Sequence, residues 1–163
     1  FALFNTMLGG GEQSRLFQRI REELGLAYSI YSTHYASKGA GLFTVSAAVS
    51  PKQQLRVLGE IREILAGLAG GIGEEEFLRA RAQIKSSFIL GLESVAARAT
   101  YVGRNELLEG RAVEETEVLA ALDRLEPRDI ERLAARLLQN APWALAVAGK
   151  VEDREAYLPY IRP

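Results

Sequence analysis

Two strand patterns that follow each other closely limit the fold of this chain more than any other feature. Residues 26–35 are rich in Tyr, Ile and Thr, which are enriched in strands. Residues 42–49 alternate in polarity. The side chains expected on one face of that strand are Phe43, Val45, Ala47 and Val49. Because residues 37–41 form a turn with two glycines, we expect an antiparallel hairpin.

Most of the remaining chain has helical patterns separated by glycine or proline. Residues 1–8 read as the end of a helix, and three glycines stop it, since glycine costs about 1 kcal/mol in a helix interior. Further helices are expected at residues 14–24, 50–68, 74–108 with a bend near Gly91, 117–125 and 127–138. A third strand is expected at residues 143–149, apolar on both faces like a central strand, before a short helix or coil at 153–163.

Strands and helices are therefore segregated along the chain rather than alternating. This order predicts an α+β domain in which helices pack on one face of an antiparallel sheet. A length of 163 residues fits one domain, so we expect residues 1–163 to form a single unit. A three-stranded sheet is thin, and a strand upstream of Phe1 would complete it better.

Two helix boundaries carry specific signals. Ser50 can cap a helix whose first residue is Pro51, and Gln53 can complete a capping box. Gly25 is expected to end the helix of residues 14–24 in a left-handed cap.

The composition excludes several classes of protein. Hydrophobic residues make up 48% and charged residues 25% of the chain, as in ordinary globular proteins. The absence of cysteine excludes a disulfide scaffold and a cysteine nucleophile. No apolar run approaches the roughly 20 residues that a membrane-spanning helix needs. A net charge of −1 and no polybasic segment argue against nucleic acid and anionic membranes.

His34 is the only histidine, which leaves the chain poorly equipped to bind zinc by itself. A mid-strand histidine is usually a surface or hydrogen-bonded residue, although a catalytic or ligand role stays open. The carboxylate runs at residues 74–76 and 114–117 read as solvated helix starts rather than metal sites. We expect no metal site in this chain.

The glycine segment Gly9, Gly10 and Gly11 admits three interpretations. A phosphate loop is disfavoured, because no strand precedes the segment and no Lys-Ser or Lys-Thr follows it. A flexible break between two helices is the simplest interpretation. The third is a loop that faces a peptide ligand.

Arg21 and Tyr28 form the most interesting pair of side chains. Arg21 lies near the end of an expected helix and Tyr28 near the start of the next strand, so the intervening turn can bring them to one edge of the fold. A guanidinium and a phenol can both donate hydrogen bonds to an oxyanion or a peptide carbonyl. In the simpler alternative, Arg21 forms a surface ion pair and Tyr28 packs in the core.

Three segments resemble the C-terminal half of the pitrilysin/insulinase family of zinc peptidases, which includes mitochondrial processing peptidase. The most specific is LGGGEQSRLFQRIREELGLAYSIYS at residues 8–32. Supporting segments are EEEFLRARAQIKSSFILGLESVAARATYVGRNELLEGR at 74–111 and ALAVAGKVE at 144–152. The resemblance covers essentially the whole chain in the expected order.

The resemblance implies a two-half peptidase that closes like a clamshell around a peptide. The partner half, on the same gene product or a separate chain, carries the inverted His-x-x-Glu-His motif and binds zinc. This half carries an arginine and a tyrosine seven residues apart, a spacing that Arg21 and Tyr28 match. Both are then implied to hold the scissile peptide and the tetrahedral intermediate. Gly9, Gly10 and Gly11 match the family's substrate-facing glycine loop, without the much longer loop of the processing-peptidase α subunit.

The chain departs from the family at its start, where the first strand of this half is missing. We therefore expect a domain truncated at its N-terminus. The rival function is a non-catalytic scaffold or interaction subunit with the same fold, and a third is a small-molecule-binding module with an apolar pocket. Arginine outnumbers lysine 16 to 4, which hints at a GC-rich bacterial genome, and we expect a bacterial cytoplasmic location.

Overall fold

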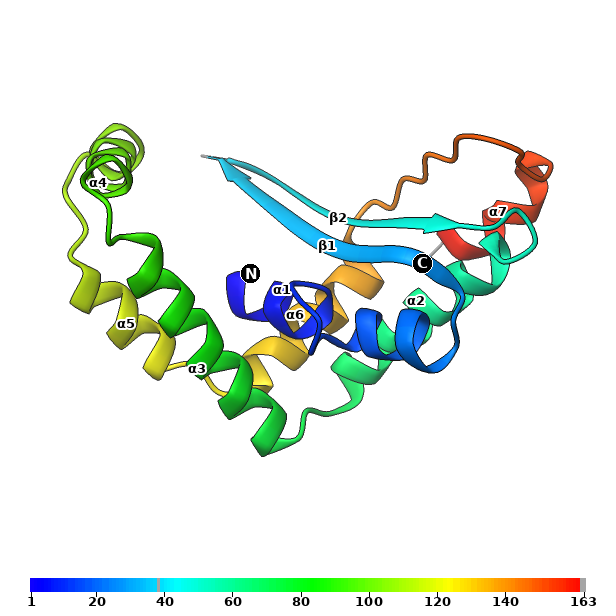
Figure 1. Cartoon of the computed structure of the whole chain (residues 1–163), viewed down its shortest axis with the longest axis horizontal. Helices are drawn as coiled ribbons and strands as arrows, with labels where there is room; N and C mark the ends of the chain where they lie inside the picture. Colours follow the sequence, from blue (N-terminus) through cyan, green and yellow to red (C-terminus); the bar gives the residue numbers. More distant parts are fainter. Residues whose placement is uncertain (38, 162–163) are drawn as a thin grey trace.

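The computed structural model describes residues 1–37 and 39–161 and has an α+β architecture (Figure 1). A hairpin of two antiparallel strands lies across one side of a helical layer, as the sequence order predicts. The elements, in chain order, are α1 (Ala2–Leu8), the π-helix η1 (Phe17–Glu23), β1 (Ala27–Ser37), β2 (Ala40–Val49), α2 (Gln54–Gly70), α3 (Glu74–Gly91), α4 (Val95–Glu109), α5 (Glu115–Asp123), α6 (Pro127–Asn140) and α7 (Arg154–Ile161).

The core lies between the hairpin and the helices. Leu3, Phe4 and Leu8 on α1, together with Leu16 and Ile20 beside and within η1, are almost completely buried. From the hairpin, Ile30 is buried on the helix side, and the side chains that pack against the core are Phe43, Val45 and Val49. Ala47, expected on the same face, stays exposed. Burial of one face of the hairpin therefore positions both strands on the helices.

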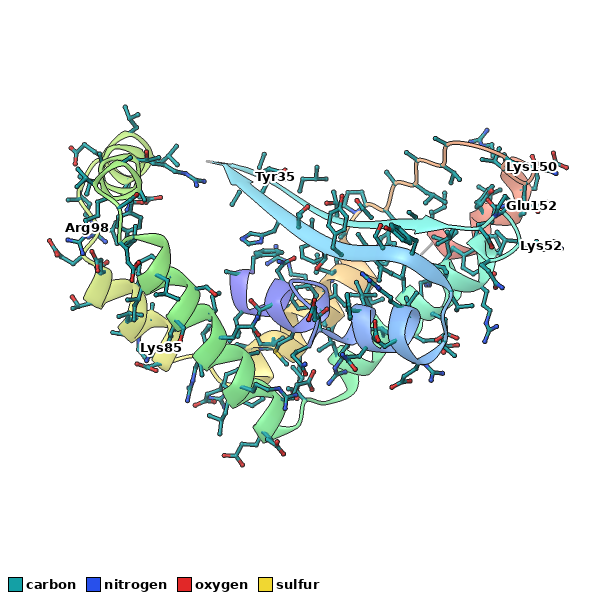
Figure 2. All side chains as sticks on the ribbon, in the orientation of Figure 1. Tyr35, Lys52, Lys85, Arg98, Lys150 and Glu152 are labelled. Atoms are coloured by element: carbon teal, nitrogen blue, oxygen red, sulfur yellow. The ribbon has the colours of Figure 1, made fainter. Side chains whose placement is uncertain are left out.

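The helices form an extended layer in which α2 packs against α6, and α3 against α1 and α5. Lys85 of α3, labelled in Figure 2, forms an ion pair with Asp123 at the end of α5, with Nζ 2.8 Å from Oδ2. Arg15 forms two hydrogen bonds to the Glu76 carboxylate, at 2.8 and 2.7 Å, and so ties the segment before η1 to α3.

The expected strand at residues 143–149 is wrong, because this segment has no strand structure and belongs to no sheet. It runs from α6 to α7 as irregular chain (Figure 1). Trp143 is anchored to α6 by a hydrogen bond from its indole Nε1 to the Leu137 carbonyl, at 3.0 Å. A strand forms only where a neighbouring backbone accepts and donates its hydrogen bonds. In the described part of the chain, the sheet contains only β1 and β2.

Three helix predictions also need correction. The segment expected as an ordinary helix at residues 14–24 is a π-helix over Phe17–Glu23. Pro51 lies in a turn and α2 begins after Gln53, because the Gln54 side chain donates to the Pro51 carbonyl at 2.8 Å and holds that turn. The helix expected to bend near Gly91 ends there, since Ser94 caps a new helix by accepting from the Ala97 amide at 3.1 Å.

Candidate functional site

A β-bulge at the start of β1 determines where Tyr28 points. Ala27 pairs with Val49 and Ser29 with Ala48, so Tyr28 is the extra residue on its strand. Strict alternation backwards from the buried Ile30 would turn Tyr28 toward the helices and Ala27 outward. The bulge adds one residue, so that Ala27 is buried and Tyr28 is 85% exposed. The alternative in which Tyr28 packs in the core is therefore wrong.

Arg21 lies in the last turn of η1 with its side chain exposed. Its guanidinium carbon is 4.7 Å from the centre of the Phe17 ring, within the range of a cation–π contact. Its Nε is 3.7 Å from a carboxylate oxygen of Glu22, a surface ion pair of the kind that contributes little. The stacked guanidinium therefore keeps its N–H donors accessible to a ligand.

A short turn connects the two residues without joining their side chains. Gly25 has φ +58°, the left-handed conformation expected for it after the helix. The Leu26 amide donates to the Ile20 carbonyl at 2.9 Å, which holds the start of β1 against η1. Among the described residues, no hydrogen bond or ring contact joins Arg21 to Tyr28. The structure thus brings both to exposed positions on either side of one turn, where each can donate to a ligand.

The bulge opens onto a shallow pocket of about 540 Å³. Its walls are the turn and bulge at Gly25–Tyr28 and the end of β2 with the turn that follows, including Ala48, Ser50 and Gln53. Sequence reasoning missed Ser50 and Gln53 as residues that line this pocket because it placed them in a helix start. The turn geometry that holds them depends on the Gln54 side chain and is not visible in the hydrophobic pattern.

The glycine segment that follows α1 packs closely against the backbone of β1. The Gly9 carbonyl accepts a hydrogen bond from the Ser32 amide at 3.0 Å. A β-carbon at Gly9 would lie 2.6 Å from the nitrogen of Ser32, and one at Gly10 would lie 2.9 Å from the Asn5 carbonyl oxygen. Gly11 has more room, with the Gln83 amide at 3.5 Å. Glycine is therefore needed at positions 9 and 10 because a side chain there would collide with neighbouring backbone atoms.

His34 lies on the helix side of β1, opposite Phe43, and is partly buried. Burial lowers the pKa of its imidazole below the usual range, which favours the neutral form. Within the described residues, no three side chains of the His, Cys, Asp and Glu types gather closely enough to hold a metal ion. The residues present therefore do not fit a zinc site.

Comparison with known families identifies the family of this chain. Residues 1–84, which include the glycine segment, Arg21 and Tyr28, match the family model described as the peptidase M16 inactive domain. The chain belongs to the peptidase M16 family. The resemblance to pitrilysin and insulinase is thereby confirmed, with this chain as the domain that lacks the zinc motif.

Bacterial relatives of this M16 domain are described as zinc proteases. The chain is 38% identical over 155 residues to an uncharacterized zinc protease of Streptomyces coelicolor, covering 94% of this chain and 34% of that protein. It is 40% identical over 157 residues to one of Mycobacterium leprae, covering 94% and 35%. The chain thus spans about a third of the length of these relatives.

Solved structures share the M16 fold of this chain. A conserved protein from Enterococcus faecalis superposes with a TM-score of 0.73 at 29% identity, over 83% of this chain and 32% of that one. The peptidase M16 inactive domain from Pseudomonas fluorescens gives 0.72 at 21%, over 85% and 32%. A chain of complex III2 from Candida albicans gives 0.70 at 17%, over 82% and 34%, and so shares the fold. Within the described residues, no helix is long and apolar enough to span a membrane.

Proposed function

We propose that this chain is the substrate-binding half of a two-half zinc metalloendopeptidase. The observation that carries the proposal is the bulge that presents Tyr28 to solvent beside a pocket, one turn away from the exposed Arg21. Family membership and relatives described as zinc proteases support a role in peptide cleavage. A homologous zinc-binding half and a peptide substrate are the partners in this proposal.

Arg21 and Tyr28 act on the carbonyl oxygen of the scissile peptide bond. The Arg21 guanidinium and the Tyr28 hydroxyl donate hydrogen bonds to this oxygen, which gains negative charge as the tetrahedral intermediate forms. The stacking of Arg21 on Phe17 limits the motion of its long side chain before substrate arrives. Zinc in the partner half would supply Lewis-acid activation, a role that no cluster of side chains among the described residues can fill.

The test is turnover of a quenched-fluorescent peptide by the assembled protease. We expect Arg21→Ala and Tyr28→Phe each to lower kcat roughly 10²-fold, the usual effect of removing one oxyanion donor, with unchanged zinc content. Arg19→Ala is the matched control on the same element, because Arg19 pairs with Glu23 and Glu60 and should leave kcat within about twofold. Unchanged turnover in both site variants would exclude this site.

The rival function is a scaffold subunit with the same fold, which the fold of the complex III2 chain keeps open. It predicts that this chain forms a stable complex with a zinc-bearing half. That complex would either cleave no peptide or cleave peptides no faster than the zinc-bearing half alone. Cleavage that requires both halves supports the substrate-binding role. The relatives are bacterial, and the cytoplasmic location that we propose is tested by cell fractionation.

A further inference from the structure

The hairpin has one face turned toward the helices and one turned away from them (Figure 1). Ile30 and Ser32 are buried on the helix side. Because side chains alternate along a strand, Tyr31, Thr33 and Tyr35 of β1 lie on the opposite face. The register there forms three cross-strand pairs, Tyr31 with Ser46, Thr33 with Thr44, and Tyr35 with Leu42. We call these six residues the outer hairpin face.

The outer hairpin face is an accessible aromatic surface. Tyr31 is 50% and Tyr35 68% exposed, and Leu42 opposite Tyr35 is exposed as well. Tyr35 lies toward the free end of the hairpin (Figure 2). Tyrosine offers a large contact area with few rotatable bonds, so holding it against a ligand costs little conformational entropy. These side chains are therefore suited to binding rather than to core packing.

No charged side chain belongs to the outer hairpin face, although a quarter of the whole chain is charged. In its middle, the hydroxyls of Thr33 and Thr44 are 2.7 Å apart and share one hydrogen bond. An apolar group can cover this face without stripping water from a charge, and over Thr33 and Thr44 it meets hydroxyls that already share a hydrogen bond. A charged group placed there would lose water and gain no counter-charge. The electrostatics therefore select an uncharged, apolar occupant.

The outer hairpin face continues into the candidate site. The next pair along the hairpin is Ser29 with Ala48, and Ala48 also lines the pocket at the bulge. Tyr28 stands at that end, so Tyr28, Tyr31 and Tyr35 follow one another along β1. A strand rises about 3.3 Å per residue, so Tyr31 and Tyr35 lie roughly three and seven residue lengths from Tyr28. An extended peptide held at Tyr28 would reach both rings.

We propose that the outer hairpin face binds apolar side chains of an extended peptide, about three to seven residues from the cleaved bond. This inference rests on the proposed function, because it takes the carbonyl held at Tyr28 as its starting point. It adds a substrate class, namely peptides whose segment beside the cleavage site is uncharged and aliphatic or aromatic.

The test uses the assembled protease and peptides with one cleavage site, which carry leucine, serine or glutamate at each position within seven residues on either side. We expect wild type to cleave the peptide with leucine at a position in this range with a higher kcat/KM than the peptide with glutamate there. Tyr31→Thr or Tyr35→Thr should lower this leucine-to-glutamate ratio of kcat/KM about tenfold, a usual size for an apolar contact. Threonine keeps the strand propensity. Tyr31→Phe keeps the ring and should retain the preference.

The control variant is Leu107→Ser, which removes an exposed apolar side chain from α4 and should leave every ratio unchanged. If both threonine variants keep the wild-type ratios while Tyr28→Phe lowers turnover of all peptides, this inference is overturned and the proposed function stands. If Tyr28→Phe and Arg21→Ala both leave turnover unchanged, the proposed function itself fails. Sedimentation can also test whether a second copy of this chain covers the face. A dimer that Tyr31→Thr dissociates, with unchanged peptide preference, would show that the second copy binds there and would overturn the inference.

Discussion

At Gly9 a β-carbon would lie 2.6 Å from both the nitrogen and Oγ of Ser32, closer than such atoms approach in proteins. Because one of these atoms is backbone, the contact between α1 and β1 must open to admit a methyl group. We expect Gly9→Ala to lower the free energy of unfolding by about 1–3 kcal/mol, as overpacking usually does. Urea unfolding measures this change.

Gly11→Ala is the matched control for that substitution, because its β-carbon would meet only the flexible Gln83 side chain at 3.5 Å. We expect its stability to stay within about 0.5 kcal/mol of wild type. Equal stability of the two alanine variants would contradict the close approach of α1 to β1.

Tyr157 is a second residue whose effect on stability follows from specific contacts. Its buried hydroxyl donates to Oε1 of Gln54 and accepts from the Glu152 amide at 2.9 Å. Tyr157→Phe leaves these groups without their partner, so we expect a loss of about 1–3 kcal/mol in urea unfolding. Tyr35→Phe, with an exposed side chain, should cost almost nothing, and a similar cost for both would contradict the network.

Among the elements, the hairpin shows what local pattern can and cannot predict. The alternation of residues 42–49 and the glycine-containing turn predicted both strands and their pairing, and Gly25 was correctly expected to end the preceding helix. The bulge was not predicted, since it depends on how two strands align rather than on either sequence. The outward direction of Tyr28, on which the site depends, follows only from that alignment.

The segment 143–149 shows the opposite limit. Its apolar composition is typical of a central strand, but composition cannot supply a neighbouring strand. Likewise, the helical pattern of residues 14–24 predicts a helix, in which Leu16 and Ile20 are buried, without distinguishing α from π hydrogen bonding. Apolar periodicity therefore predicts where the elements lie along the chain. The available hydrogen-bond partners determine whether each segment becomes a strand, an α-helix, a π-helix or irregular chain.

Helix α6 offers a pH-dependent prediction. Asp129 accepts a hydrogen bond from the Glu126 amide at 2.9 Å and lies next to Arg132. The backbone hydrogen bond first, and Arg132 second, hold the pKa of the Asp129 carboxyl below its ordinary value of 3.8. A carboxyl with a depressed folded-state pKa stabilises the fold fully above its unfolded pKa and loses this contribution as pH falls through the folded value.

We therefore expect Asp129→Asn to be less stable than wild type near neutral pH and the difference to shrink below about pH 4. Urea unfolding of both proteins between pH 7 and pH 2.5 measures it, and the difference between them removes the titration of all other carboxylates. A stability difference that stays constant across this range would contradict the role of the ionised carboxylate.

At the scale of the whole molecule, stability is unevenly distributed. Helix α4 stands at one end of the helical layer, and none of its residues is buried as a whole (Figure 1). Its contacts include an edge-on ring contact between Tyr101 and Phe88, at 5.7 Å, and an ion pair between Arg98 and Glu115. The Tyr101 hydroxyl and the Asn105 amide nitrogen are buried without a hydrogen-bond partner among the described residues, which is unfavourable.

Local opening of α4 should therefore require little free energy, whereas α2 contributes Val57, Leu65 and Leu68 to the core. We expect backbone amides of α4 to exchange hydrogen for deuterium at least tenfold faster than those of α2, as measured by mass spectrometry of the folded chain. Leu68→Ala should accelerate exchange in α2 because it leaves a cavity, and Leu107→Ser should change neither helix strongly. Equal protection of the two helices would contradict the weak packing of α4 against the rest of the chain.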